Sequence, residues 1–448
     1  MTPNTTIYQF TISIAVLLAV MTLIVPRRFV LAPFVIAACF VPTDQRVIIM
    51  ELDFTVLRML VVVGVLRVFL YGEYRPLRYT AIDYLLLAWA VVGSVVFIAR
   101  EGDTEAVINR AGYAFNAVGL YWLFRQNLVT WDSLKHVFAL FAVAALVSLP
   151  LVLIESTTGA NPFVYLGKVI TAVREEKLRC QGAFPHSIMM GLYWAVLTPV
   201  FLALARVEKH KLLYPAACVA SIVIIAATAS STPILVFLMT VAVFGVFAWR
   251  QYTSVAVWAS VGALTALHIV MNAPVWHLLA RVNVIGGSTG WHRYNLIDKA
   301  IRHFGEWMLM GCSRTDHWGF GLEDVTNQYV LEGVRGGAVT LLLFVALMYV
   351  VMKTLLRSSL AHSDRRSRFL AWSLFAMMFA HGVGFIGASY FGQITVLWYL
   401  TLAAAAMLAE PHRIRNRNAV RPVFLNGGSI HANHAPARCA MRTAGSTS

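Results

Sequence analysis

Charge is scarce in this sequence of 448 residues. Asp, Glu, Lys and Arg together make up 13% of the chain, roughly half of the 25% or so that soluble domains carry. Hydrophobic residues make up 59%, and the mean hydropathy is +0.70. This composition excludes an ordinary soluble domain and predicts a protein that crosses a membrane several times.

Cysteine is scarce as well, and its count of five is odd, which argues against a disulfide framework. Cys180 and Cys312 fall in the two long polar segments of the chain. Two interpretations of this pair stay open. They form a disulfide bridge in an oxidising compartment, or they are two inert thiols.

Strict alternation of polar and apolar residues is missing from the apolar windows, so these windows are not barrel strands. A helix that crosses the hydrocarbon core needs about 20 apolar residues. About thirteen windows approach this length: 7–25, 29–42, 54–70, 81–98, 107–124, 134–154, 186–205, 212–229, 232–249, 254–271, 328–352, 369–388 and 391–409. The first has no small-residue cleavage site after it and is interpreted as a retained span. Because the second is short enough for a half-span, we predict an all-α polytopic protein with about 12 or 13 transmembrane helices.

Acidic residues are fewer than basic ones, 21 against 36, and the formal net charge is +15. Because cytoplasmic loops are enriched in Lys and Arg close to span ends, these residues predict the orientation. Those that mark the cytoplasmic side are Arg27, Arg28, Arg206, Lys209, Lys211, Lys353, Arg357, Arg365, Arg366 and Arg368. The polar segments 155–185 and 272–327 then face outward.

The segment 411–448 contains basic residues and no acid. It is predicted to be a disordered cytoplasmic tail attracted to membrane lipids, separate from a transmembrane domain over 1–410. No aromatic pattern or motif supports binding to nucleic acid, so nucleic acid is not an expected partner.

The longest polar interruption of the apolar pattern runs from 272 to 337. Within it, 291–311 has apolar residues along one helical face, which predicts an amphipathic helix lying on the membrane surface. Arg293 falls on the buried face, where a guanidinium is costly without an anionic partner. That partner is either a substrate anion or a carboxylate of the chain, Asp298 or Glu332.

The outward segment 155–185 ends in RCQGAFPHS, where Arg179 precedes the next span. The small residues nearby let a ligand approach the backbone, so Arg179 is a candidate anion contact, with an interfacial anchor as the alternative. The short turn 229–233, ASSTP, faces the same side. Its hydroxyls either cap the following helix or line the site.

The sequence DVTNQYVLEGVRGGAV leads from the second outward segment into a span whose outer end contains ionisable residues. Glu332 and Arg335 are three residues apart and can pair on one helix face. Ionisable residues inside a span indicate function by default, so both are candidates for substrate binding. A purely structural pair is the alternative.

The motifs RCQGAFPHSIMMG, SST, GWHRYNLID and DVTNQYVLEGVRGGAVTLLLF resemble those of the O-antigen ligase and O-antigen polymerase superfamily of bacterial membrane proteins. The resemblance extends over residues 30–410. It implies a GT-C-like helical fold and transfer of an undecaprenyl-diphosphate-linked glycan at the periplasmic face of the inner membrane, without a metal or cofactor. Arg179 and Arg293 would contact the diphosphate, and Asn327 would match the Asn of the family's His-Asn pair.

Thr326 stands where the family has His, so the identity of the catalytic base is open. Asp324 is one candidate, as a partly desolvated carboxylate that orients and deprotonates a hydroxyl; a helix N-cap is its alternative role. His317 is the other candidate, because an imidazole exchanges protons near neutral pH.

These expectations favour a polysaccharide polymerase that joins lipid-linked repeat units of an O-antigen or exopolysaccharide. The alternatives are a ligase that transfers the glycan to a lipid acceptor, and a lipid-linked glycan flippase. A flippase is less favoured because transporters concentrate polar residues near the membrane midplane. Expected partners are the lipid-linked donor, a glycan or lipid acceptor, membrane lipids, a chain-length regulator and a separate flippase.

Overall fold

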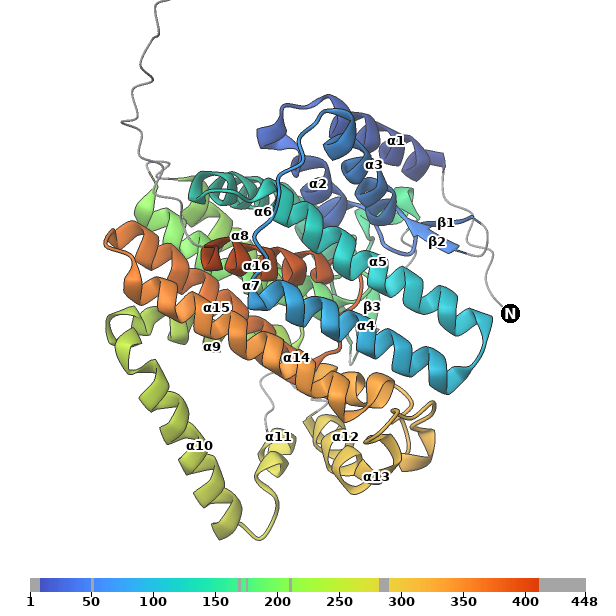
Figure 1. Cartoon of the computed structure of the whole chain (residues 1–448), viewed down its shortest axis with the longest axis vertical. Coiled ribbons are helices and arrows are strands. Elements are labelled where there is room, and N and C mark those ends of the chain that lie inside the picture. Colours follow the sequence, from blue (N-terminus) through green and yellow to red (C-terminus); the bar gives the residue numbers. More distant parts are fainter. Residues whose placement is uncertain are drawn as a thin grey trace, which may run out of the picture. The chain divides into compact units, whose positions relative to one another are not determined.

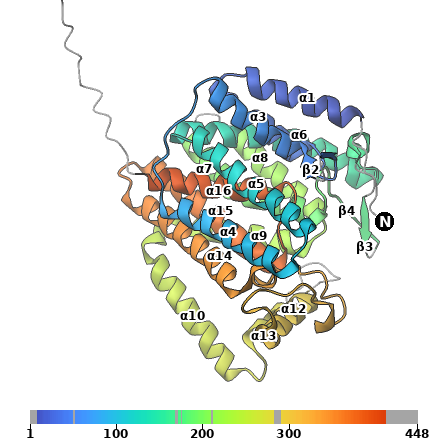
Figure 2. The same cartoon turned by 45° about the vertical axis from the view of Figure 1, so that its right-hand side comes forward.

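The computed structural model describes residues 9–49, 52–167, 171–174, 176–208, 212–281 and 290–410. The predicted basic tail, 411–448, lies outside the described residues. Within the described ranges most of the chain is helical, which confirms the all-α class. The structure is drawn in two views in Figures 1 and 2.

Every apolar window predicted from the sequence coincides with a helix. These helices are α1 (Gln9–Ile24), α2 (Ala32–Phe40), α3 (Val56–Leu70), α4 (Ala81–Glu101), α5 (Thr104–Asn127), α6 (Trp131–Thr158), α7 (Ser187–Val207), α8 (Leu213–Ala227), α9 (Ser231–Gly245), α10 (Thr253–Val270), α14 (Gln328–Ala361), α15 (Arg365–Gly387) and α16 (Ile394–Ala409).

Among the described residues, 6 helical segments are long and apolar enough to cross a membrane. They are Ala81–Glu101, Trp131–Thr158, Ser187–Val207, Ser231–Val270, Gln328–Ala361 and Arg365–Gly387. The other predicted windows form helices that are shorter or less apolar. These segments support a protein that crosses a membrane several times. The number of about 12 or 13 transmembrane helices stays a prediction.

Short elements lie between the long helices. They are η1 (Arg27–Phe29), η2 (Pro162–Leu166), η3 (Val246–Tyr252), η4 (Val275–His277), α11 (Leu278–Arg281), α12 (Gly290–Arg302), α13 (Phe304–Trp307) and η5 (Asp316–Trp318). Two antiparallel hairpins pair β1 (Arg46–Ile49) with β2 (Leu52–Thr55), and β3 (Ala172–Arg174) with β4 (Lys177–Arg179). In the second hairpin Ala172 lies opposite Arg179. β1, β3 and β4 lie outside the predicted spans, whereas β2 overlaps the first two residues of the span predicted over 54–70.

The core of the bundle is built around α7. In its apolar window 83% of the residues are buried, including Tyr193 and Trp194. α7 packs against α8, α9 and α15, and α14 packs against α4 and α15. The polar segment with α12 and α13 lies beside one end of α14, which α13 contacts (Figures 1 and 2).

The helix α10 has no buried residue, and its ribbon stands apart from the other long helices in both views. Its exposed apolar side chains include Trp258, Ile269 and Val270. An uncovered apolar surface of this kind is unfavourable in water and favourable in hydrocarbon. This exposure supports placement of the chain in a membrane.

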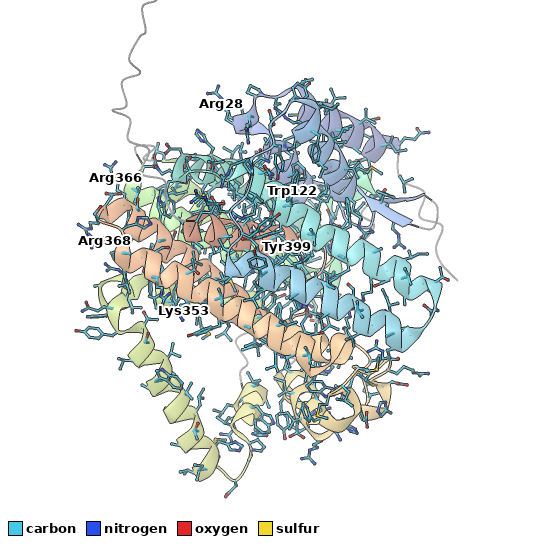
Figure 3. All side chains as sticks on the ribbon, in the orientation of Figure 1. Arg28, Trp122, Lys353, Arg366, Arg368 and Tyr399 are labelled. Atoms are coloured by element: carbon cyan, nitrogen blue, oxygen red, sulfur yellow. The ribbon has the colours of Figure 1, made fainter. Side chains whose placement is uncertain are left out.

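Four of the basic residues predicted to mark one membrane side are labelled in Figure 3. Figure 3 labels Arg28, Lys353, Arg366 and Arg368, all in the left half of the view. In the same orientation, α12 and α13 of the second polar segment lie in the lower right half (Figure 1). The orientation of the chain in a membrane stays a prediction from its Lys and Arg residues.

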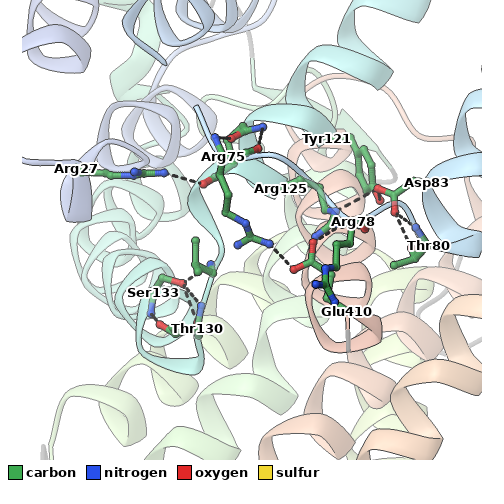
Figure 4. A network of polar contacts seen from close by, with 12 residues as sticks. Arg27, Arg75, Arg78, Thr80, Asp83, Tyr121, Arg125, Thr130, Ser133 and Glu410 are labelled. Carbon is green, nitrogen blue, oxygen red and sulfur yellow. Dashed lines mark hydrogen bonds and ion pairs between the residues drawn. The ribbon is translucent and has the colours of Figure 1, made fainter. Parts of the chain in front are cut away.

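A polar network ties the end of α16 to α4 and α5 (Figure 4). The Arg125 guanidinium is fully buried; its Nε donates to Asp83 Oδ1 and its Nη2 to Glu410 Oε1, each at 3.1 Å. Tyr121 donates its hydroxyl to the same Asp83 oxygen at 2.7 Å, and Arg75 pairs with Glu410. Removing one partner would leave a buried charge without compensation, so this network is expected to be important for stability.

Two sequence-based expectations need correction. The amphipathic helix predicted over 291–311 is broken at His303, which has φ −94° and ψ 22° and separates α12 from α13. Gly305, a poor helix former, lies two residues further on, within the short α13. The thiols of Cys180 and Cys312 are both free, so the disulfide alternative is wrong.

Candidate functional site

Arg179 and Arg293 meet at the start of α9, at its N-cap residue Ser230 and at Thr232 in its first turn. The Nη2 atom of Arg179 donates to Ser230 Oγ, and the Nη2 atom of Arg293 donates to Thr232 Oγ1, each at 2.6 Å. Arg179 comes from the first polar segment, at the end of β4, and Arg293 comes from the second, on α12. The two predicted anion contacts therefore converge from separate loops.

Local structure explains why Arg179 reaches this turn. The amide of Cys180 donates to Ala227 O at 3.1 Å, which fixes the end of β4 beside the end of α8. Ala229 then takes a positive φ of 43°, a conformation that non-glycine residues rarely adopt, and reverses the chain into α9. Strain of this kind concentrates at functional sites.

The hydroxyls of the turn do not act as the predicted helix cap. Ser230 occupies the N-cap position of α9 without a side-chain cap hydrogen bond. Its hydroxyl donates to Thr228 O at 2.9 Å and accepts from Arg179 instead. Two neighbouring residues of the predicted turn, Ser231 and Thr232, line an apolar cavity.

Asn327 lies on the other side of Arg293. Arg293 Nε donates to Gly387 O at 3.3 Å, and Asn327 Nδ2 donates to the preceding carbonyl, Ile386 O, at 3.1 Å. Asn327 Oδ1 also accepts from the amide of Val330 at 3.1 Å and so caps α14. Asn327 is therefore the N-cap residue of α14, and Asp324 does not have the capping role that the sequence suggested as its alternative.

An apolar cavity of about 190 Å³ opens next to Thr232 and Arg293. Besides these two residues and Gly387 its lining is almost entirely aliphatic, and includes Leu235 and Met239 on α9. The cavity lies between the start of α9 and the end of α15. A guanidinium beside a narrow apolar cavity suits an amphiphile with an anionic head and a hydrocarbon chain.

A second, polar cavity of about 560 Å³ contains Asp324 and Arg335 in its lining, together with Arg100, Glu101 and Glu323. Arg100 is held there by Val334 O at 2.8 Å and by Glu101 at 2.7 Å. Asp324 is exposed, and so is not the partly desolvated carboxylate expected from the sequence. Basic and acidic groups facing one open cavity suit a polar ligand with several hydroxyls.

The two cavities come close at the end of α15, where Gly387 lines the apolar cavity and Ser389 lines the polar one. Asp324 precedes Asn327 by three residues, so their Cα atoms lie within roughly 10 Å of each other. Between them, Thr326 has a buried hydroxyl oxygen that has no hydrogen-bond partner in the part of the chain that the structure describes.

Glu332 is buried and contributes to neither of these cavities. Its carboxylate accepts from Trp89 Nε1 at 2.8 Å and from Gln328 Nε2 at 2.6 Å. The predicted helical pair with Arg335 does not form, because Glu332 turns toward α4 while Arg335 is exposed and lines the polar cavity. These contacts give Glu332 a structural environment, not a position open to substrate.

His317 belongs to a separate cluster on the loop surface. Its Nε2 lies 2.8 Å from Glu306 Oε2, and His303 Nδ1 lies 2.7 Å from Glu306 Oε1. Hydrogen bonds from Trp318, His303 and His317 lower the pKa of Glu306 to about 2. The His303 to Glu306 spacing was visible in the sequence, whereas the approach of His317 depends on the loop between them.

No protein-family model, curated protein sequence or solved structure matches the chain. The resemblance seen in the motifs therefore stays an expectation. The features that bear on function are the two arginines at the start of α9 and the two cavities near the end of α15.

Proposed function

We propose that this chain is a membrane glycosyltransferase that uses a polyprenyl-diphosphate-linked glycan as donor. The convergence of Arg179 and Arg293 on the turn 230–232, beside an apolar cavity, carries the proposal. A diphosphate offers several anionic oxygens, which guanidinium groups bind through paired hydrogen bonds. The adjoining cavity would take the first part of the hydrocarbon chain.

The chemistry follows from this placement. An acceptor hydroxyl attacks the anomeric carbon, the bond from that carbon to the diphosphate oxygen breaks, and the hydroxyl proton passes to a base. Negative charge develops on the leaving diphosphate, where fixed arginines stabilise the transition state more than the ground state. A resident metal is not required for this role.

Asp324 is the favoured base. It lines the polar cavity, which would hold the sugars, and lies close in sequence to Asn327 and to the unpartnered hydroxyl of Thr326. His317 is the weaker candidate, because both it and His303 are directed at Glu306. A general base must reach the proton that it removes, and proximity to the cavity favours Asp324.

Within this class we favour a polymerase that joins lipid-linked repeat units, with an O-antigen ligase as the alternative. The polar cavity is large enough for sugar residues of an acceptor glycan, whereas a ligase needs an additional binding surface for a lipid acceptor. The motif resemblance to the O-antigen ligase and polymerase superfamily agrees with both, and with action at the periplasmic face of a bacterial inner membrane.

A reconstituted assay tests the proposal. Purified protein in proteoliposomes is incubated with an undecaprenyl-diphosphate-linked oligosaccharide, and the products are separated by size. A ladder of lengthened glycans identifies a polymerase, and a single transfer to an added lipid acceptor identifies a ligase. Movement of the lipid across the bilayer without a new glycosidic bond would contradict the proposal and indicate a flippase.

A further inference from the structure

Three metal-ligand side chains meet on the surface of the second polar segment. The ligand atoms of His303, Glu306 and His317 all lie within 4.8 Å of one another. Glu306 stands between the two imidazoles, with one carboxylate oxygen 2.7 Å from His303 Nδ1 and the other 2.8 Å from His317 Nε2. Both rings therefore direct a nitrogen at the same carboxylate.

Trp318 holds this cluster in shape. Its indole Nε1 donates to Glu306 Oε2 at 3.0 Å, and its ring stacks on His303 with centroids 5.4 Å apart and an interplanar angle of 13°. Trp318 itself is buried, with 2% exposure, so it provides a fixed surface under an otherwise accessible cluster. Outer partners of this kind orient the residues that bind a metal.

We propose that His303, Glu306 and His317 form a binding site for a divalent transition-metal ion, with Zn²⁺ as the best match. Two imidazole nitrogens and one carboxylate oxygen are a ligand set that Zn²⁺ takes in proteins, with a water in the fourth position. Ca²⁺ and Mg²⁺ prefer sites built from oxygen alone, so the two histidines select against them.

The ligand atoms must move to bind one ion: the two imidazole nitrogens, which lie within 4.8 Å of each other, have to approach it together, and the nitrogen–oxygen pairs have to open. Two ligands at about 2.0–2.1 Å from one tetrahedral Zn²⁺ lie roughly 3.3 Å apart. The nitrogen–oxygen pairs are now at 2.7 and 2.8 Å, so each would open by roughly half an ångström. All three side chains have an exposed fraction between 29% and 50%, which leaves room for this movement and for entry of the ion.

The ion would cross-link two parts of the second polar segment. His303 and Glu306 lie at the junction of α12 and α13, while His317 lies on η5. A metal bridging them would fix α12, which carries Arg293, to the stretch that leads into Asp324 and Asn327. This role goes beyond the proposed glycosyl transfer and does not depend on it, because the ion would not take part in that reaction.

Zinc binding to the full chain tests the site directly. Protein freed of metal by a chelator and kept in detergent is titrated with ZnCl₂ in a calorimeter, and the stoichiometry is compared between the parent and Glu306→Gln. The parent should bind one more Zn²⁺ ion than this variant, because Gln retains hydrogen bonding but loses the anionic ligand. Other histidines and cysteines of the chain contribute equally to both proteins.

Two further variants test whether zinc binding depends on the residues around Glu306 or is adventitious. Trp318→Phe keeps the buried ring but removes the indole donor, and should weaken zinc binding about tenfold or more. His292→Ala, on α12 outside the cluster, should leave binding unchanged. Should Glu306→Gln fail to fold, His317→Ala at an exposed position replaces it. Equal stoichiometry in the parent and the ligand variants would overturn the proposal.

Discussion

The guanidinium groups of Arg179 and Arg293 donate to hydroxyls two positions apart in one turn, Ser230 and Thr232, with identical distances of 2.6 Å. The two arginines belong to different polar segments, and β4 and α12 bring them together. The start of α9 thus contacts two guanidinium groups, and that of Arg293 also lines the apolar cavity.

Arg293→Lys should lower glycan transfer at least a hundredfold, while the protein still inserts and folds. Lysine keeps the charge but presents a point charge in place of a planar fork, and loss of one fixed donor to a developing anion typically costs a factor of about 10²–10³. Turnover in the proteoliposome assay is the measurement. Normal turnover of Arg293→Ala would remove this residue from the mechanism.

Thr232→Val should reduce turnover roughly tenfold or more, because the hydroxyl that positions Arg293 is lost and hydrogen bonds to charged groups contribute about 1.5–3 kcal/mol. Valine has nearly the same shape, so packing is preserved. A matched control is Thr240→Val on the same helix, whose hydroxyl is buried without a partner among the described residues. That variant should retain parental turnover, and equal effects of both substitutions would point to a general disturbance of α9.

Asp324→Asn should abolish turnover if Asp324 is the base, because an amide cannot accept the hydroxyl proton. Helix capping is not affected, since Asn327 caps α14. His317→Ala should leave turnover largely intact in the same assay. The reverse pattern, with an active Asp324→Asn and an inactive His317→Ala, would transfer the role of base to His317.

Asp83→Asn should lower the free energy of unfolding by about 3 kcal/mol, because a fully buried Arg125 loses a charged partner. Thermal unfolding in detergent measures the change. Asp132→Asn is the control: this carboxylate is 80% exposed and pairs with Lys135 on the surface, where ion pairs contribute little. Similar unfolding temperatures for both variants would mean that the network in Figure 4 does not stabilise the bundle.

The helical class and the positions of the helices could be predicted from the sequence, and the family resemblance implied that Arg179 and Arg293 act on one diphosphate. Long apolar runs determine a membrane helix almost alone, and polar segments between them must lie at the bundle ends. Arg293 was recognisable because a charge on an apolar face needs a partner. Its observed partners, Thr232 and the carbonyl of Gly387, are tertiary and could not be read from local spacing.

Other predictions failed where a tertiary contact replaced a local one. Helical spacing suggested a pair between Glu332 and Arg335, but the indole of Trp89 on α4 takes the Glu332 carboxylate. Residue type suggested that Asp324 caps α14, whereas Asn327, three residues later, does so. Neither the partner of Glu332 nor the choice of N-cap residue could be predicted from the residues next to it in the sequence.

Direct binding of the lipid carrier tests the central claim most closely. The affinities of undecaprenyl diphosphate and undecaprenyl monophosphate are measured for the parent and for the double variant Arg179→Ala/Arg293→Ala in nanodiscs. The account predicts that the parent prefers the diphosphate and that the double variant loses this preference while keeping weak binding of the hydrocarbon chain. A double variant that binds the diphosphate as tightly as the parent would contradict it.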